Sequence, residues 1–149
     1  MSKQYLNFVQ KLFKYFIFLF FVSNLHASKV IDINEYLSDI EIVSSYQDRK
    51  TGLMFRRSIP KDYGMLFIWP YEGKQCVWMK NTFIPLSIAY IDFRGKIIEI
   101  YDMVPFSKDS VCSTKAAKYA LEVNSGWFEE KNINIGDSIE IKKILSNDK

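Results

Sequence analysis

Along most of the chain, apolar and polar residues alternate with the two-residue period of β-strands rather than the 3.6-residue period of helices. The segment after Gly64 is almost wholly apolar, and the later segments alternate more regularly. Residues 92–95, Asp-Phe-Arg-Gly, predict a hairpin turn between two of these segments. We expect strands over residues 40–43, 65–69, 77–81, 86–91, 96–101, 119–123 and 138–142.

Two short helices are expected beside these strands. Ser45 followed by Asp48 resembles a capping box, in which each side chain binds a free backbone N–H, and this helix would run through Phe55. Ser125 would cap a second helix that contains Trp127. The combination predicts a single α+β domain with a mostly antiparallel sheet, which can close into a barrel, and two short helices.

The first 27 residues form a separate segment with three parts. The first part contains three lysines and no acidic residue, and the second is an uninterrupted apolar run over residues 15–22. The third part, mostly small and polar residues, ends at Ala27. The run is too short to span a hydrocarbon core about 30 Å thick, but it fits the apolar part of a secretory signal peptide. We therefore expect residues 1–27 to be a signal peptide and residues 28–149 to be the exported domain, periplasmic or extracellular. An uncleaved N-terminal membrane anchor is the alternative.

The charge of the chain resides in that leader. The formal net charge is +3 and the sequence pI is about 8.7, but Lys3, Lys11 and Lys14 account for the whole excess. The neutral remainder argues against a nucleic-acid partner. The only histidine, His26, also lies in the leader, which excludes Ser-His-Asp and Cys-His catalysis and histidine-ligated zinc or haem from the domain. No cofactor and no metal site are expected.

The two cysteines, Cys76 and Cys112, both lie in the domain. In an oxidising compartment an even number of cysteines favours a disulfide. Two separate, unreactive thiols are the alternative, because spacing along the chain does not establish that the two residues are neighbours.

Five blocks of the sequence together resemble the bacterial and archaeal family called domain of unknown function 192. The resemblance covers about residues 38–143 and implies a compact, barrel-like α+β domain, often behind a signal peptide, with no agreed activity. Ser87 stands where many relatives carry an aspartate. Cys76 stands where no cysteine is expected in the family, whereas Cys112 lies in a loop where the family often has one. The blocks are Gly-Leu-Met-Phe-Arg at 52–56, Gly-Met-Leu-Phe at 64–67, Trp-Met-Lys-Asn-Thr at 78–82, Ile-Pro-Leu at 84–86 and Leu-Glu-Val-Asn-Ser-Gly-Trp-Phe at 121–128.

The candidate ligand site consists of polar residues on two of the expected strands. Alternation places Trp78 and Lys80 on one face of their strand, with Asn81 following, and places Glu122 and Asn124 on one face of a later strand. If those faces meet, Lys80 and Glu122 can form an ion pair beside the Trp78 indole, where a lysine can act as a base or bind an anion. The alternative is a salt bridge on a solvated sheet face.

Two functions therefore compete. The first is an exported binding or accessory domain of the cell envelope, with a small molecule or an envelope component as its partner. The second is a hydrolase of an envelope polymer or small anionic substrate, acting through Glu122 with Lys80 or Asp102. Contact with a membrane is expected only through an uncleaved leader.

Overall fold

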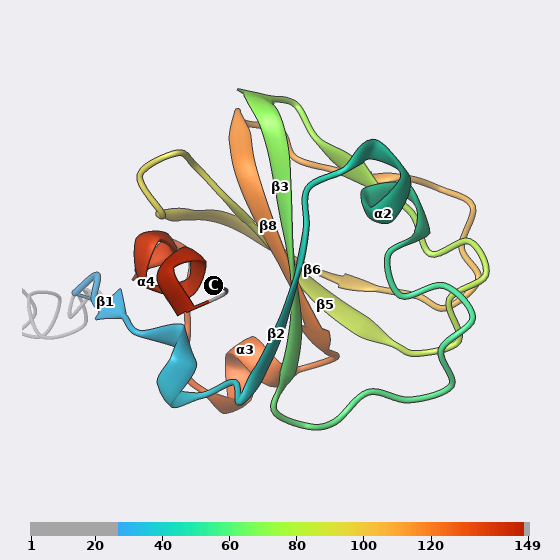
Figure 1. The fold of residues 1–149 in the computed structure, drawn as a ribbon, viewed down its shortest axis with the longest axis horizontal. Coiled ribbons are helices and arrows are strands. Elements are labelled where there is room, and N and C mark those ends of the chain that lie inside the picture. The colour runs from blue at the N-terminus through green and yellow to red at the C-terminus, as the bar shows by residue number, and fades with distance from the viewer. Residues whose placement is uncertain (1–26, 148–149) are drawn as a thin grey trace, which may run out of the picture.

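A five-stranded sheet forms the centre of the computed structural model, which describes residues 27–147 (Figure 1). The spatial strand order is β2-β3-β8-β5-β6, in which β2 and β3 are parallel and the other neighbours are antiparallel. The predicted leader, apart from Ala27, lies outside the described residues. The strands are β2 (Asp39–Val43), β3 (Tyr63–Gly73), β5 (Leu86–Ile91), β6 (Ile97–Met103) and β8 (Ala117–Asn124).

Short elements cover both faces of this sheet. On one face lie the parallel pair β1 (Val30–Ile31) and β9 (Ser138–Ile139) and the helices η1 (Ile33–Glu35), α3 (Trp127–Glu130) and α4 (Ile141–Asn147). On the other face lie α2 (Tyr46–Thr51) and the antiparallel pair β4 (Cys76–Val77) and β7 (Val111–Cys112), with α2 and α4 on opposite sides of the sheet in Figure 1. The expected α+β class is confirmed, and the sheet does not close into a barrel. None of the helices in residues 27–147 is long and apolar enough to cross a membrane.

Strand alternation divides the apolar residues between two hydrophobic clusters. Leu66, Leu121 and Val123 face the first cluster, beneath α3 and α4. Met65 and Ile88 face the second, beneath α2 and the long loops. The described members of both clusters lie between Ile31 and Ile144.

Two of the expected elements differ in the structure. The strand expected over residues 77–81 ends at Val77, because Asn81 adopts a left-handed conformation (φ 58°) that turns the chain away from the extended course. The last strand ends at Ile139, and helix α4 replaces the expected continuation through residue 142. Ile141 and Ile144, three residues apart on α4, both pack into the first cluster.

The helix ends also differ from the expectation. The Ser45 hydroxyl caps α2 by accepting the N–H of Asp48, as expected, but the helix ends at Gly52 (φ 47°) and does not reach Phe55. At α3 the N-cap is Gly126 (φ 79°), and no side chain caps the helix, so the expected capping role of Ser125 is wrong.

Candidate functional site

Glu122 lies in the middle of the sheet, on the face beneath α2 and the loops. Its neighbours across the ladder are Met65 on β3 and Ile88 on β5, and it is only 4% exposed. Burial raises the pKa of its carboxyl to about 8, and no hydrogen bond or ion pair from another described residue offsets that desolvation. Glu122 is therefore a largely neutral carboxylic acid at pH 7.

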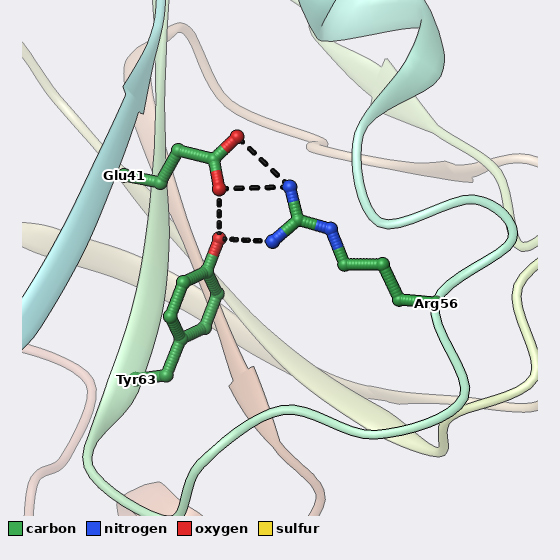
Figure 2. A network of polar contacts seen from close by, with 3 residues as sticks. All are labelled: Glu41, Arg56 and Tyr63. Atoms are coloured by element: carbon green, nitrogen blue, oxygen red, sulfur yellow. Dashed lines mark hydrogen bonds and ion pairs between the residues drawn. The ribbon is translucent and has the colours of Figure 1, made fainter.

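A polar network occupies the edge of the same face (Figure 2). One nitrogen of the Arg56 guanidinium lies 2.9 and 2.8 Å from the two carboxylate oxygens of Glu41, and the other donates to the Tyr63 hydroxyl at 2.9 Å. The Tyr63 hydroxyl donates to Glu41 at 2.5 Å. Burial acts to raise the pKa of Glu41, but the hydrogen bonds from Tyr63 and Arg56 outweigh it and lower that pKa.

This network was not expected from the sequence. The sequence does contain one sign of this network, in strand β2. Strand alternation places Glu41 on the same face as the buried Val43. The network joins β2, β3 and the loop after α2. Because Glu41 lies in the same row as Met65 and Glu122, its carboxylate and that of Glu122 belong to strands about 10 Å apart.

The structure does not bring Lys80 and Glu122 together. Lys80 is exposed and its ammonium lies 5.2 Å from the ring centre of Trp78, a cation–π contact. No ion pair joins Lys80 to Glu122 within residues 27–147. The expected association of Lys80 with Trp78 is present, but the expected ion pair with Glu122 is not.

The remaining candidates are each engaged in the fold. The Asn124 amide donates to the Pro60 carbonyl at 2.8 Å, and the Asn81 carbonyl accepts the N–H of Phe55 at 2.9 Å. Asp102 accepts a hydrogen bond from the Ser87 hydroxyl, which in turn accepts the N–H of Gly126 at 2.9 Å.

Asp102 and Glu122 lie on opposite faces of the sheet. Asp102 pairs with Ser87, and Glu122 pairs with the next residue, Ile88, whose side chain points to the other face. Neither of the two pairs expected for a hydrolase, Glu122 with Lys80 or Glu122 with Asp102, is therefore brought together among the described residues.

A pocket of about 340 Å³ opens between α2, β3 and the segment that contains β4 and Trp78. It is lined by three aromatic side chains, two cations and one half of a disulfide, and no acid is among them. Trp69 is backed by Phe67, with ring centres 6.0 Å apart in a stacked arrangement. The lining residues are Tyr46, Arg49, Lys50, Trp69, Cys76 and Trp78.

A disulfide joins Cys76 to Cys112 and fixes one wall of this pocket. The two cysteines are opposite each other on β4 and β7, with Cα atoms 4.0 Å apart. Around it, the Ser113 N–H donates to the Gln75 carbonyl at 2.8 Å and the Gln75 N–H donates to the Ser113 hydroxyl at 3.0 Å. The Tyr90 hydroxyl donates to the Val111 carbonyl at 2.7 Å. Of the two readings of the cysteines, the bonded pair is the one that the structure contains.

A second buried glutamate holds the chain just after that disulfide. Glu99, 8% exposed, accepts hydrogen bonds from the backbone and hydroxyl of Thr114, from the Lys115 N–H and from the Tyr101 hydroxyl. Burial acts to raise the pKa of Glu99, and these hydrogen bonds outweigh it and lower that pKa. Glu99 and Glu122 thus share one face of the sheet but differ completely in their surroundings.

The comparisons with known proteins bear on the fold and on family membership. The family model of DUF192, described as an uncharacterized ACR, matches residues 29–141. A crystal structure from Sinorhizobium meliloti 1021, described as a candidate transcription regulator, is 34% identical with a TM-score of 0.64, covering 65% of this chain and 76% of that one. A protein of unknown function from Novosphingobium aromaticivorans DSM 12444 is 27% identical with a TM-score of 0.65, covering 66% of this chain and 71% of that one.

No curated protein matches the chain. The family match nevertheless extends over most of the sequence and over all five strands of the central sheet. Both similar crystal structures share the fold at better than one residue in four identical. The expected resemblance is confirmed, and the chain belongs to the DUF192 family.

Proposed function

We propose that this chain is an exported cell-envelope domain that binds a ring-bearing anion, and that the pocket between α2 and β4 is its binding site. The observation that carries the proposal is the convergence of two indole rings and two cations, Arg49 and Lys50, on one cavity. The leader predicted over residues 1–27 supports the envelope location. The separation of Glu122 from both Lys80 and Asp102 favours binding over hydrolysis.

The aromatic side chains define the shape of the ligand. The rings of Trp69 and Trp78 each present a negative π-face, which is complementary to the C–H groups on the flat side of a sugar or to another ring. Neither indole N–H has an acceptor among the described residues, so both can donate to a ligand hydroxyl or carboxylate. Tyr46, largely exposed on α2, adds a third ring at the rim.

The cations define its charge. Arg49 donates to the Ile68 carbonyl at 3.0 Å and also to the Ser44 carbonyl, which orients its guanidinium at the pocket wall. Lys50 makes no ion pair with any described residue. The Lys80 ammonium lies over the ring of Trp78. A carboxylate bound here would contact cations on two sides. Charge-assisted hydrogen bonds of this kind are stronger than hydrogen bonds between neutral groups.

One relative is described as a candidate transcription regulator, but a nucleic-acid role has less support in this chain. Residues 28–149 carry equal numbers of basic and acidic side chains, and nucleic-acid binding surfaces carry a marked excess of positive charge. The cations of the pocket form a small cluster that suits a single acidic group.

The test uses two sugars that differ only in the acidic group. N-acetylmuramic acid is N-acetylglucosamine with a lactyl carboxylate, so the difference in their affinities isolates the contribution of the cations. We expect the acid to bind at least about tenfold more tightly, equivalent to about 1.4 kcal/mol, when binding is followed by tryptophan fluorescence or calorimetry.

Variants separate the two parts of the site. Trp78→Ala should abolish binding of both sugars, and Lys50→Ala should weaken binding of the acid while leaving binding of the neutral sugar unchanged. Tyr71→Ala and Lys142→Ala, which alter an exposed ring and an exposed cation outside the pocket, are the matched controls and should change neither. Equal affinity for the two sugars, or unchanged binding by Trp78→Ala, would contradict the proposal.

A further inference from the structure

Three loops on the covering layer expose phenylalanine side chains to solvent. They follow α2, β4 and β6, and they lie on the side of the molecule away from β1 (Figure 1). Phe55 is 68% exposed, Phe83 42% and Phe106 55%, and Val104, close to Phe106, is 71% exposed. These four residues are called the aromatic loop surface below.

Direct contacts hold the loops together. The rings of Phe83 and Phe106 meet edge to face with centres 5.0 Å apart. The Phe106 N–H donates to the Thr82 carbonyl at 3.2 Å, and the Phe55 N–H donates to the Asn81 carbonyl at 2.9 Å. The segment from Asn81 to Phe83 is thus the common support of the other two loops.

The backbone of this surface is held in an unusual conformation. Phe55 (φ 65°) and Phe106 (φ 62°) both occupy the left-handed region, as does Asn81 (φ 58°). Bulky residues rarely adopt it, and such strain concentrates at functional sites. Here it accompanies apolar rings that face water rather than the core.

Three exposed or ring-contacting cations lie on the loops that carry the exposed rings. The Arg57 guanidinium lies 5.7 Å from the ring centre of Phe83, and Lys80 and Lys108 are exposed on the neighbouring loops. No ion pair engages these three side chains within residues 27–147. The acid nearest to them along the chain is Asp109, which leaves the surface with an excess of positive charge.

We infer that the aromatic loop surface docks on an anionic lipid bilayer, a membrane contact separate from the predicted leader. Protruding aromatic and aliphatic side chains ringed by Lys and Arg suit the interface between headgroups and acyl chains, where the rings are buried and the cations meet lipid phosphates. The exposed area also favours a bilayer over a protein. A phenylalanine offers roughly 200 Å², so the three rings expose about 300 Å², well below the roughly 800 Å² per partner of a stable protein interface.

The experiment measures binding of residues 27–149, which hold both cores, the disulfide and the family region, to vesicles. Omitting the leader prevents it from contributing to vesicle binding. We expect co-sedimentation with vesicles of phosphatidylcholine and phosphatidylglycerol (7:3), at least about tenfold weaker binding to phosphatidylcholine alone, and weakening with added salt. The double variant Phe83→Ser, Phe106→Ser should lose at least about tenfold in partition coefficient.

A matched control distinguishes this surface from exposed phenylalanine in general. Phe93 is 57% exposed and carries its own cation–π contact with Arg94 at 5.1 Å, but it lies in the β5–β6 hairpin. Phe93→Ser should leave vesicle binding within about twofold of the parent. Circular dichroism and disulfide content establish that each variant is folded.

Each other outcome overturns the inference. The inference is contradicted if the protein binds neither kind of vesicle, or if its binding does not depend on lipid charge. It is also contradicted if Phe93→Ser loses as much vesicle affinity as the double variant. A self-association, measured by sedimentation velocity, that is abolished by the double variant would also contradict it, because the surface would then be an interface between copies of the chain. Lys50→Ala, which alters the pocket and leaves Trp78 and its segment intact, is expected to bind vesicles normally, so failure of the pocket proposal and failure of this inference are distinguishable.

Discussion

Replacement of Glu122 by glutamine should make the protein more stable at neutral and alkaline pH. Its pKa is raised to about 8 in the folded state by burial, against 4.5 for an ordinary glutamate. The folded state therefore binds more protons than the unfolded state between those values. The stability that the neutral carboxyl contributes to the folded state is fully present below pH 4.5, and it is lost as the pH rises through 8.

The magnitude follows from the size of that pKa difference. At 1.36 kcal/mol per pKa unit, the shift makes the folded protein about 3 kcal/mol less stable at pH 7 than an equivalent neutral side chain would. Between pH 5 and pH 9 the free energy of unfolding should fall by about 4 kcal/mol. Glutamine resembles the protonated acid in shape and never ionises, so Glu122→Gln should remove this slope.

Few other groups obscure this pH range. Glu41 and Glu99 have lowered pKa values, so their contributions are constant above about pH 6. Burial, followed by interactions with acidic neighbours, raises the pKa values of Tyr63 and Tyr90, and those tyrosines ionise only above the range. Residues 27–149 contain no histidine.

The assay is urea unfolding of residues 27–149, followed by circular dichroism at pH 5, 7 and 9. Glu99→Gln is the matched control, because that buried glutamate accepts several hydrogen bonds as a carboxylate and should lose stability at all three pH values. A parent protein with no slope, or a Glu122→Gln variant with the same slope as the parent, would refute the reasoning. Either result would mean that the Glu122 carboxylate is hydrated or paired in solution.

Three further variants test separate parts of the fold. Gly95→Ala should cost about 3 kcal/mol in urea unfolding, since its φ is +90° and the new Cβ would lie 2.3 Å from the Ile139 carbonyl oxygen. Removing the disulfide by Cys76→Ser with Cys112→Ser should cost about 4 kcal/mol, the loop-closure value for a separation of 36 residues, measured against the oxidised parent. Arg56→Ala should cost about 1–2 kcal/mol at pH 7, and this loss should shrink in acid as Glu41 becomes protonated.

Each of these has a comparison that isolates its cause. Gly126→Ala has a similar φ of +79° but no atom within 4 Å of the new Cβ, so it should lose only the backbone part, about 1 kcal/mol. Equal losses for Gly95→Ala and Gly126→Ala would contradict the steric argument. Arg57→Ala removes a neighbouring cation outside the network and should change the stability by less than about 0.5 kcal/mol. A loss from Arg56→Ala that persists unchanged at pH 3 would point to packing instead of charge.

The central strands could be predicted because their side chains have one environment on each face. The strand over residues 86–91 was predicted with its observed limits, and its alternating residues divide between the two clusters. The segment over 77–81 could not be predicted in the same way, because the left-handed turn at Asn81 depends on contacts with other loops. Residues 138–142 are too few to separate a two-residue period from the helical spacing of Ile141 and Ile144.

The candidate site could be predicted only in part for a related reason. Trp78 and Lys80 were expected to associate and they do, since both belong to one short segment. The burial of Glu122 depends on α2 and the loops that cover it, which pattern alone does not reveal. Tyr46 on α2 and Trp69 on β3 are more than twenty residues apart in the sequence, and nothing local in the sequence relates them.

One short segment connects the two surfaces that we assign to binding. Cys76 and Trp78 line the pocket, and Asn81 supports the loop that carries Phe55. Between them Met79 is buried in the second cluster, which fixes the segment to the sheet. A ligand that moves Trp78 would therefore act on the same backbone that holds the aromatic loop surface. We expect a bound sugar acid to change vesicle affinity, and vesicles to change sugar affinity by the same factor, because coupling between two binding equilibria is reciprocal.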